Sequence, residues 1–276
     1  MVKKYFYIVF LSLVLSTFQI NAFANRDAEQ GRSYFPPILM YHDIKVTPIN
    51  GFDVAVKDFI KQLDWLAAEG YYSLSMEEFL DCVNTNRPIP EKAVLITFDD
   101  GYEGIYKYAA PELTKRKMHA TFFIFKDGIN LNLPGYPYIT DKQLKELAAN
   151  PLFAIQSHTM THPDLSNSPK IKIQQEVSTS KNFIEAYTQK PCRIIAYPYG
   201  HYNQDVLQAV KEAEYEAAFA VADLGLMGYE AKYTIPRIYM GTIMSENNMA
   251  LFKKYIIEYK NMPADAFKER FGELPR

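Results

Sequence analysis

The sequence predicts a single α/β domain in which parallel strands, covered by helices, form a barrel or a barrel-like sheet. Short apolar segments alternate with amphipathic helical segments along most of the 276 residues. The apolar segments are nearly continuous, which is typical of strands that are buried on both faces. The chain has no internal repeat, low-complexity tract or inter-domain linker. One large domain therefore accounts for its length.

Eight short segments rich in β-branched and aromatic residues are the expected strands. Several of them stop at residues that can carry chemistry, such as adjacent acids, a histidine, or a Pro-Tyr-Gly sequence. We expect strands at 38–41, 71–74, 93–98, 120–125, 153–157, 193–197, 217–221 and 233–238.

Hydrophobic residues spaced by three or four positions predict helices between these strands. Capping signals support the ends of four of them, at Gly70, at Ser75 with Glu78, at Thr140 and at Asn203. Pro111 predicts a kink, and the Gly/Pro segment 130–138 is a loop long enough to border a groove. We expect helices at 53–68, 76–83, 105–117, 141–149, 168–188, 204–213 and 249–259.

The N-terminus is expected to direct export and to lie outside the fold. Lys3 and Lys4 precede an apolar stretch at 5–18, and Ala22-Phe23-Ala24 is an A-x-A cleavage site, which together are typical of a signal peptide. An uncleaved membrane anchor is the alternative, but the stretch is short for a bilayer span of about 20 residues. We expect a signal peptide at 1–24, a flexible arm at 25–36, the folded domain at 37–262 and a tail at 263–276.

Composition limits the classes of function. A hydrophobic content of 48% excludes a disordered chain, and a formal charge of -2 provides no basic field for nucleic acid. Aromatic residues, at 14%, fill the core and can also line a sugar-binding groove. After export to the periplasm, cell surface or medium, Cys82 and Cys192 could pair, but two buried free thiols are the favoured interpretation. We expect a monomer with no stable membrane span after cleavage.

The stretch from Leu95 to Tyr102 carries the clearest chemical signal. An apolar strand ends in two adjacent carboxylates, Asp99 and Asp100, and Gly101 then allows a sharp turn. Ligands and catalytic groups collect at the carboxyl ends of strands in strand–helix proteins. Two adjacent buried carboxylates repel each other, and one of them takes up a proton unless a cation neutralises the pair. The pattern therefore predicts a bound cation.

His158 and His162 are the expected partners of that cation. They directly follow the expected strand 153–157, and a spacing of four would place them on one side of a helical turn. Neutral imidazole is a common ligand of zinc. Two histidines and one carboxylate leave coordination positions open for water and substrate, as in catalytic sites. We expect Zn²⁺, with Co²⁺ or Ni²⁺ as alternatives at the same ligands.

Three segments in this order, TFDDG at 97–101, SHTMTH at 157–162 and AYPYG at 196–200, resemble motifs of a known family. The family is that of the polysaccharide deacetylases (NodB homology, carbohydrate esterase family 4). The segment PILMYHDI at 37–44 further resembles the opening of the branch that deacetylates poly-β-1,6-N-acetylglucosamine of biofilm matrix. The resemblance covers about 37–238. It implies a distorted (β/α)7 barrel and a metal-dependent hydrolase that releases acetate from N-acetylglucosamine units.

The resemblance also implies roles for particular residues. Asp100, His158 and His162 would bind the metal, Asp99 would be the general base, and His42 would be the general acid. The family's late Leu-x-His motif is absent, which favours His42 as the acid. A hydrogen-bonded core histidine is the alternative for His42, and His201 is expected to be a loop residue near the groove.

Residues around the third motif would contact substrate. The backbone N–H near Tyr199 would stabilise the oxyanion, and the surrounding substrate site would include Pro198, Gly200 and Tyr102. Many family members have an arginine, which orients the base, at the place of Ala196. The substitutes available in this chain are Arg193 and Arg237.

Other functions remain open at this point. Peptidoglycan and chitooligosaccharides are alternative substrates within the family. A glycoside hydrolase could use Asp99 and Asp100, although its two carboxyl groups should flank the sugar at about 5–9 Å. An inactive sugar-binding module is the alternative that is not an enzyme.

Overall fold

The computed structural model describes residues 35–85, 89–221, 232–241 and 249–259. The expected signal peptide at 1–24, most of the arm at 25–36 and the tail at 263–276 lie outside these ranges. Within them, no helix has the length and apolar character needed to cross a membrane.

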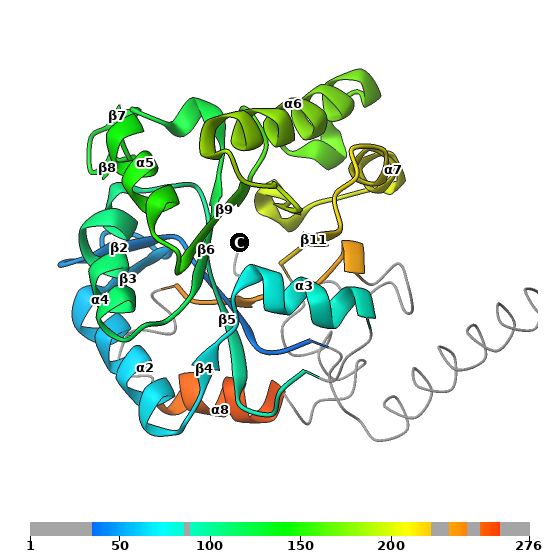
Figure 1. The fold of residues 1–276 in the computed structure, drawn as a ribbon. Coiled ribbons are helices and arrows are strands. Elements are labelled where there is room, and N and C mark those ends of the chain that lie inside the picture. Colours follow the sequence, from blue (N-terminus) through cyan, green and yellow to red (C-terminus); the bar gives the residue numbers. More distant parts are fainter. Residues whose placement is uncertain (1–34, 86–88, 222–231, 242–248, 260–276) are drawn as a thin grey trace, which may run out of the picture.

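Parallel strands form the central sheet, as the alternation of strands and helices predicted (Figure 1). Their order is β11-β10-β9-β6-β5-β1-β12, and β4 pairs with β5. The strands are β1 (Ile38–Tyr41), β4 (Tyr72–Ser73), β5 (Ala93–Phe98), β6 (Ala120–Ile124), β9 (Phe153–Ser157), β10 (Ile194–Ala196), β11 (Ala217–Phe219) and β12 (Ile238–Tyr239).

The segment before β12 closes this sheet into a distorted barrel. Ile235 bridges Phe219 of β11, and the backbone N–H of Arg237 donates to the carbonyl of Val221 at 2.9 Å. One residue later, Ile238 pairs with β1 at the other edge of the sheet. The sequence predicted one strand at 233–238. That prediction was wrong in its bounds, because the segment changes partner between 237 and 238.

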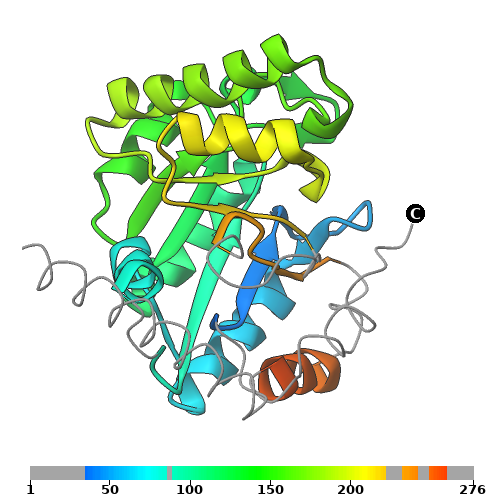
Figure 2. The same ribbon diagram turned by 90° about the vertical axis from the view of Figure 1, so that its right-hand side faces the viewer.

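Helices surround the strands, and α6 and α7 lie side by side over one end of the sheet (Figures 1 and 2). The helix expected at 105–117 begins as a π-helix, η1 (Ile105–Ala109), and continues as α4 with right-handed helical backbone at Ala109 and Ala110, so Pro111 stands in the first turn of α4 and no break occurs there. The helices are α2 (Val56–Ala68), α3 (Met76–Thr85), α4 (Ala110–Lys115), α5 (Asp141–Ala149), α6 (Lys170–Thr188), α7 (Gln204–Glu212) and α8 (Met249–Tyr259).

Two expectations for local structure were incomplete. Residues 53–55 were expected to begin a helix, but they form β3 (Asp53–Ala55), which pairs with β2 (Asp43–Lys45). The expected loop at 130–138 contains a short hairpin of β7 (Asn132–Leu133) and β8 (Tyr136–Pro137). In the chain, β2 and β3 follow β1, and the hairpin follows β6. The thiols of Cys82 and Cys192 are buried and free, as favoured from the sequence.

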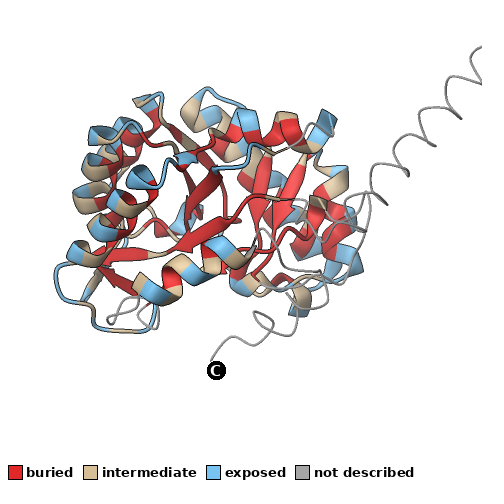
Figure 3. Cartoon of the chain, turned by 90° about the horizontal axis from the view of Figure 1, so that it is seen from below, coloured by how far each residue is buried: buried red, intermediate tan, exposed pale blue. Residues whose placement is uncertain are grey.

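Alternation of side chains along β5 divides the core into two clusters. One set faces the surrounding helices, and its members are Val94, Ile96 and Phe98. The other set, Ala93 and Leu95, faces the barrel interior together with apolar residues of α3. Figure 3 shows the result, with buried strands inside and exposed outer faces on the helices. Asp99 lies four positions after Leu95, so the alternation places both side chains on the same face. The carboxylate of Asp99 therefore points into the barrel interior.

Candidate active site

The carboxylate of Asp99 is held by a buried arginine. Arg237 donates from Nη1 to Oδ1 and from Nη2 to Oδ2, each at 2.7 Å. Asp99 is 3% exposed and Arg237 is 1% exposed. The planar guanidinium matches both carboxylate oxygens, so the pair fixes the plane of the carboxylate.

Arg237 is itself positioned by the barrel closure. Its Nε donates to the carbonyl of Ala220 at 3.2 Å, and its guanidinium lies over the rings of Phe123 and Phe219, at 5.5 and 5.8 Å from their centroids. Burial by itself raises the pKa of Asp99, but the charges of Arg237 and His158 outweigh it and lower that pKa. Asp99 is therefore ionised at neutral pH.

Asp100 and the two expected histidines converge beside this pair. Their ligand atoms all lie within 4.8 Å of one another. Asp100 Oδ1 lies 3.4 Å from His158 Nε2 and 3.1 Å from His162 Nε2, and the two Nε2 atoms are 3.2 Å apart. Asp100 has φ +69° and Gly101 has φ +83°, so the chain turns sharply after β5 and aims the two neighbouring carboxylates differently.

The donor set fits a divalent cation. His158 Nδ1 lies 2.7 Å from the carbonyl of Ala196. A carbonyl can only accept, so Nδ1 carries a proton, and Nε2 is the ring atom of His158 that would bind a cation. Burial raises the pKa of Asp100, but the neighbouring imidazoles of His158 and His162 outweigh that effect and hold the pKa well below its ordinary value. Two imidazole nitrogens and a carboxylate oxygen are ligands that zinc and its neighbours accept.

The ligand loop at 158–162 is not the helical turn that the sequence predicted. Thr159 has φ +73° and His162 has φ +56°, both in the left-handed region. The N–H of His162 donates to Thr159 Oγ1 at 3.1 Å, and the N–H of Thr159 donates to Ser157 Oγ at 3.2 Å. The two imidazoles still meet, because the left-handed residues fold the chain back over a spacing of four.

His42 lies between β1 and β2 on another side of the site. Its ring contacts those of Phe52 and Tyr239, at centroid distances of 5.2 and 5.9 Å. Burial lowers the pKa of His42, and the charges of Asp100 and Asp99 oppose that change. Within the described ranges its buried Nδ1 has no hydrogen-bond partner. A histidine serving only the core would be expected to have one.

Aromatic rings border the triad. Tyr102 packs on Tyr138 at 4.6 Å between centroids, and Phe125 lies 5.6 Å from Tyr138 and 5.2 Å from His162. Tyr199 is 56% exposed, and its ring lies 4.9 Å from that of His162. Such a border can support the apolar faces of sugar rings. Phe125 was not singled out in the sequence, although it directly follows the strand β6.

The turn at 198–200 has backbone requirements of its own. Tyr199 has φ +60° and Gly200 has φ +73°. A Cβ at Gly200 would collide with Val221. This turn therefore needs glycine at 200, and it brings Pro198 and Tyr199 to the edge of the triad.

Comparison with known proteins then identifies the family. Residues 86–218 match the family described as polysaccharide deacetylase. Over 199 residues the chain is 30% identical to the poly-β-1,6-N-acetyl-D-glucosamine N-deacetylase of Staphylococcus aureus, covering 69% of this chain and 68% of that protein. The chain belongs to the polysaccharide deacetylase family. It is therefore a hydrolase of carbon–nitrogen bonds other than peptide bonds.

Solved structures of similar proteins agree with this assignment. A Streptococcus pyogenes deacetylase, PplD, in complex with acetate is 29% identical, with a TM-score of 0.68, over 79% of this chain and 97% of that chain. IcaB from Ammonifex degensii has a TM-score of 0.69 at 23% identity, over 81% of this chain and 97% of that chain, and supports the fold alone. A further relative, compared by sequence, is the Bacillus subtilis protein YxkH. It is 32% identical over 209 residues, which cover 76% of this chain and 72% of that protein.

Two arginines were candidates to orient Asp99 in the deacetylase, and the structure shows which of them contacts it. Arg237 makes the contact, whereas Arg193 pairs with Glu216 and Glu77. The expectation for Arg193 was wrong because a side chain at the start of β10 meets these surface acids. His201 lies outside the triad, as expected, and its Nδ1 lies 3.0 Å from Asp164 Oδ2.

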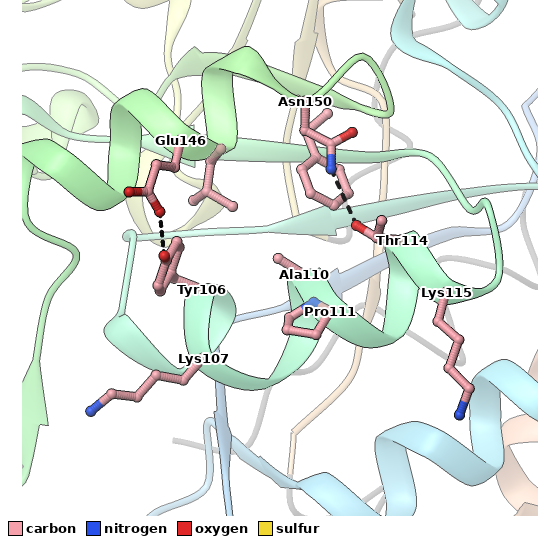
Figure 4. Close-up of a pocket in the computed structure, with 10 residues that line it drawn as sticks. Tyr106, Lys107, Ala110, Pro111, Thr114, Lys115, Glu146 and Asn150 are labelled. Atoms are coloured by element: carbon pink, nitrogen blue, oxygen red, sulfur yellow. Dashed lines mark hydrogen bonds between the residues drawn. The ribbon is translucent and has the colours of Figure 1, made fainter.

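A surface pocket of the deacetylase lies apart from the triad, between η1, α4 and α5 (Figure 4). Tyr106 donates to Glu146 across it, and Asn150 Nδ2 donates to Thr114 Oγ1 at 3.2 Å. None of the residues with an expected role lines this pocket. We assign it no part in the chemistry.

Proposed function

We propose that this chain is an exported, monomeric and metal-dependent N-deacetylase of N-acetylglucosamine units in a polysaccharide, with poly-β-1,6-N-acetylglucosamine as the favoured polymer. The observation that carries the proposal is the triad of Asp100, His158 and His162 beside the buried pair of Asp99 and Arg237. The similarity to the Staphylococcus aureus enzyme supports the choice of polymer. The N-terminal sequence supports export to the periplasm, cell surface or medium.

Asp100, His158 and His162 would hold the cation, with Zn²⁺ favoured and Co²⁺ or Ni²⁺ as alternatives. When bound, a divalent cation supplies Lewis acidity toward the acetyl carbonyl and lowers the pKa of a nearby water. Asp99 takes the proton of the attacking water. A carboxylate has about four lone-pair sites, so the two bonds from Arg237 leave room for that proton.

Protonation of the leaving group falls to His42. The departing amine is a poor leaving group until its nitrogen gains a proton, and an imidazole can deliver one near neutral pH. The backbone N–H of Tyr199 stabilises the oxyanion that develops on the acetyl carbonyl. Pro198 and Gly200 shape the turn that presents this N–H, and Tyr102 lines the substrate site.

The first prediction tests the reaction and the polymer together. Purified protein should release acetate from poly-β-1,6-N-acetylglucosamine faster than from chitooligosaccharides or peptidoglycan. A chelator should abolish the release, and added Zn²⁺ or Co²⁺ should restore it, because the cation activates the water. Acetate is measured enzymatically, and reducing ends are measured in parallel.

Each outcome of this experiment has a separate meaning. New reducing ends without acetate would indicate a glycoside hydrolase and contradict the proposal. Binding of the polymer without either product, with metal present, would indicate a sugar-binding module. Faster release from peptidoglycan or chitooligosaccharides would keep the deacetylase and change its substrate.

The second prediction concerns His42. His42→Ala should lower kcat by about 10²–10⁴-fold, the range for loss of a general acid. The metal affinity should change little, because His42 is not in the triad. His201→Ala is the matched control and should leave kcat within about threefold of wild type, because His201 is held by Asp164 outside the triad. An unchanged kcat in His42→Ala would remove it as the acid.

A further inference from the structure

A buried carboxylate on α6 accepts hydrogen bonds from the loop that carries both expected histidine ligands. Glu176 Oε2 accepts the backbone N–H of Met160 at 2.8 Å and that of Thr161 at 3.0 Å. Its Oε1 accepts the hydroxyl of Thr161 at 2.6 Å. All three donors lie between His158 and His162 in the chain. Glu176 is 5% exposed, and in the described part of the chain it forms no ion pair with a basic side chain.

These bonds stabilise a backbone that is unfavourable on local grounds. Thr159 and His162 both have positive φ, which is strained for residues with a Cβ and persists only where surrounding contacts impose it. The two N–H groups that Glu176 accepts would otherwise be left without a carbonyl partner in a partly buried loop. Glu176 therefore satisfies the donors that this folded-back conformation creates.

The same conformation brings the two imidazoles together. In this structure the Nε2 atoms of His158 and His162 lie 3.2 Å apart because the loop reverses between them. The ring of His158 is held by a hydrogen bond from its Nδ1 to the backbone carbonyl of Ala196. Among the described residues, no hydrogen bond holds Nδ1 of His162 in the same way. The position of His162 thus depends on the loop, and the loop depends on Glu176.

We propose that Glu176 is a positioning residue that sets the affinity and geometry of the metal site by holding the 158–162 loop, without touching the metal or the substrate. The proposal rests on the proposed function, because it requires that a cation binds the triad. It assigns to α6 a role that the three sequence motifs do not contain. Glutamate at this position serves the enzyme through three hydrogen bonds to the loop.

The pattern of donors allows a sharp comparison of variants. In Glu176→Gln the amide oxygen can still accept both N–H groups, and the amide NH₂ can donate to the hydroxyl oxygen of Thr161. The conservative variant can therefore keep the loop in place, whereas Glu176→Ala removes all three bonds. Glu185→Ala is the matched control, because Glu185 lies on the same helix and instead accepts from Lys181 and the N–H of Cys192.

The experiment titrates Co²⁺ into metal-free protein, following the visible absorption of the bound ion and competition with a chelator. Glu176→Ala should weaken Co²⁺ binding by about 10–100-fold, the usual effect of losing a residue that orients metal ligands, and should change the absorption band. Glu176→Gln should stay within about threefold of wild type and keep the band, and Glu185→Ala should match wild type. Thermal unfolding of each metal-free variant separates loss of fold from loss of affinity.

The results distinguish this inference from the proposed function. Wild-type affinity and spectrum in folded Glu176→Ala would overturn the role of Glu176 and leave the deacetylase proposal intact. Failure of the wild-type protein to bind Co²⁺ or Zn²⁺ would overturn both. If Glu176→Ala does not fold, Thr161→Val removes only the hydroxyl bond, and it should weaken Co²⁺ binding measurably while keeping the fold. Wild-type affinity in Thr161→Val together with a tenfold or greater loss in Glu176→Gln would also contradict the proposal, because the pattern of bonds predicts the reverse.

Discussion

Asp99→Asn is expected to lower kcat for acetate release by about 10²–10⁴-fold. An amide has nearly the shape of a carboxylate but cannot take the proton of the attacking water. Asp100, His158 and His162 are untouched, so the variant should bind metal and polymer as the wild type does. Acetate release, metal content and polymer binding measured on the same preparation check this prediction.

Binding without turnover is the result that supports Asp99 as the base. This result also distinguishes an enzyme from a sugar-binding module, because a module releases no acetate and so has no turnover for the substitution to remove. A variant that retains more than about a tenth of wild-type kcat would exclude Asp99 as the base. Since Asn leaves the guanidinium of Arg237 buried without its anion, thermal unfolding is measured alongside kcat.

Arg237→Met is expected to lower the free energy of unfolding by about 3–5 kcal/mol at pH 7. The substitution leaves the carboxylate of Asp99 in the barrel interior without its countercharge, while both residues are almost fully buried. Urea unfolding at pH 7 measures the loss. Activity should also fall, because the plane of the Asp99 carboxylate is no longer fixed.

The loss should depend on pH in a defined direction. The folded protein lowers the pKa of Asp99, so the pairing contributes stability that is present above the unfolded pKa of about 3.9. That stability disappears as pH falls through the lower pKa of the folded state. Without Arg237, burial raises the pKa of Asp99. The difference in unfolding free energy between wild type and Arg237→Met should therefore begin to narrow above about pH 4, where Asp99 of the variant takes up a proton, and should keep narrowing as pH falls through the lower pKa of the wild type.

The double variant Asp99→Asn with Arg237→Met is the control for both predictions. It removes both charges of the pair at once, so it should be more stable than the sum of the two single losses predicts. It should not recover activity, because the base is still absent. Strictly additive losses of stability would contradict the coupling of the two residues.

The sequence alone was sufficient for most of the fold. Strands at 93–98 and 153–157 and helices at 141–149 and 249–259 were expected with the bounds that the structure has. These elements carry their own local signals, namely continuous apolar strands, helical periodicity and, for 141–149, the cap at Thr140. The triad of Asp100, His158 and His162 was also expected, because its members follow strands whose carboxyl ends meet at one edge.

The backbone of the ligand loop could not be predicted in the same way. A spacing of four is compatible with a helical turn or with a folded-back loop. The choice depends on Glu176, which lies 14 residues beyond His162 in the middle of a helix. Nothing in the local sequence marks such a residue, since an acid within a long helix is usually a solvated one.

For Asp99, the sequence indicated the residue and its chemistry, and only the tertiary structure decided which arginine holds it. Its type, its place after β5 and the adjacent Asp100 are local, and they indicated the chemistry directly. The arginine that holds it is 138 positions away. Arg193 was an equal candidate in the sequence, because both arginines stand near expected strands. Only the closure of the barrel, in which 235–239 bonds first to β11 and then to β1, placed Arg237 in the interior and left Arg193 outside. A long-range contact of this kind is set by how the sheet closes, and local propensity contains no information about that.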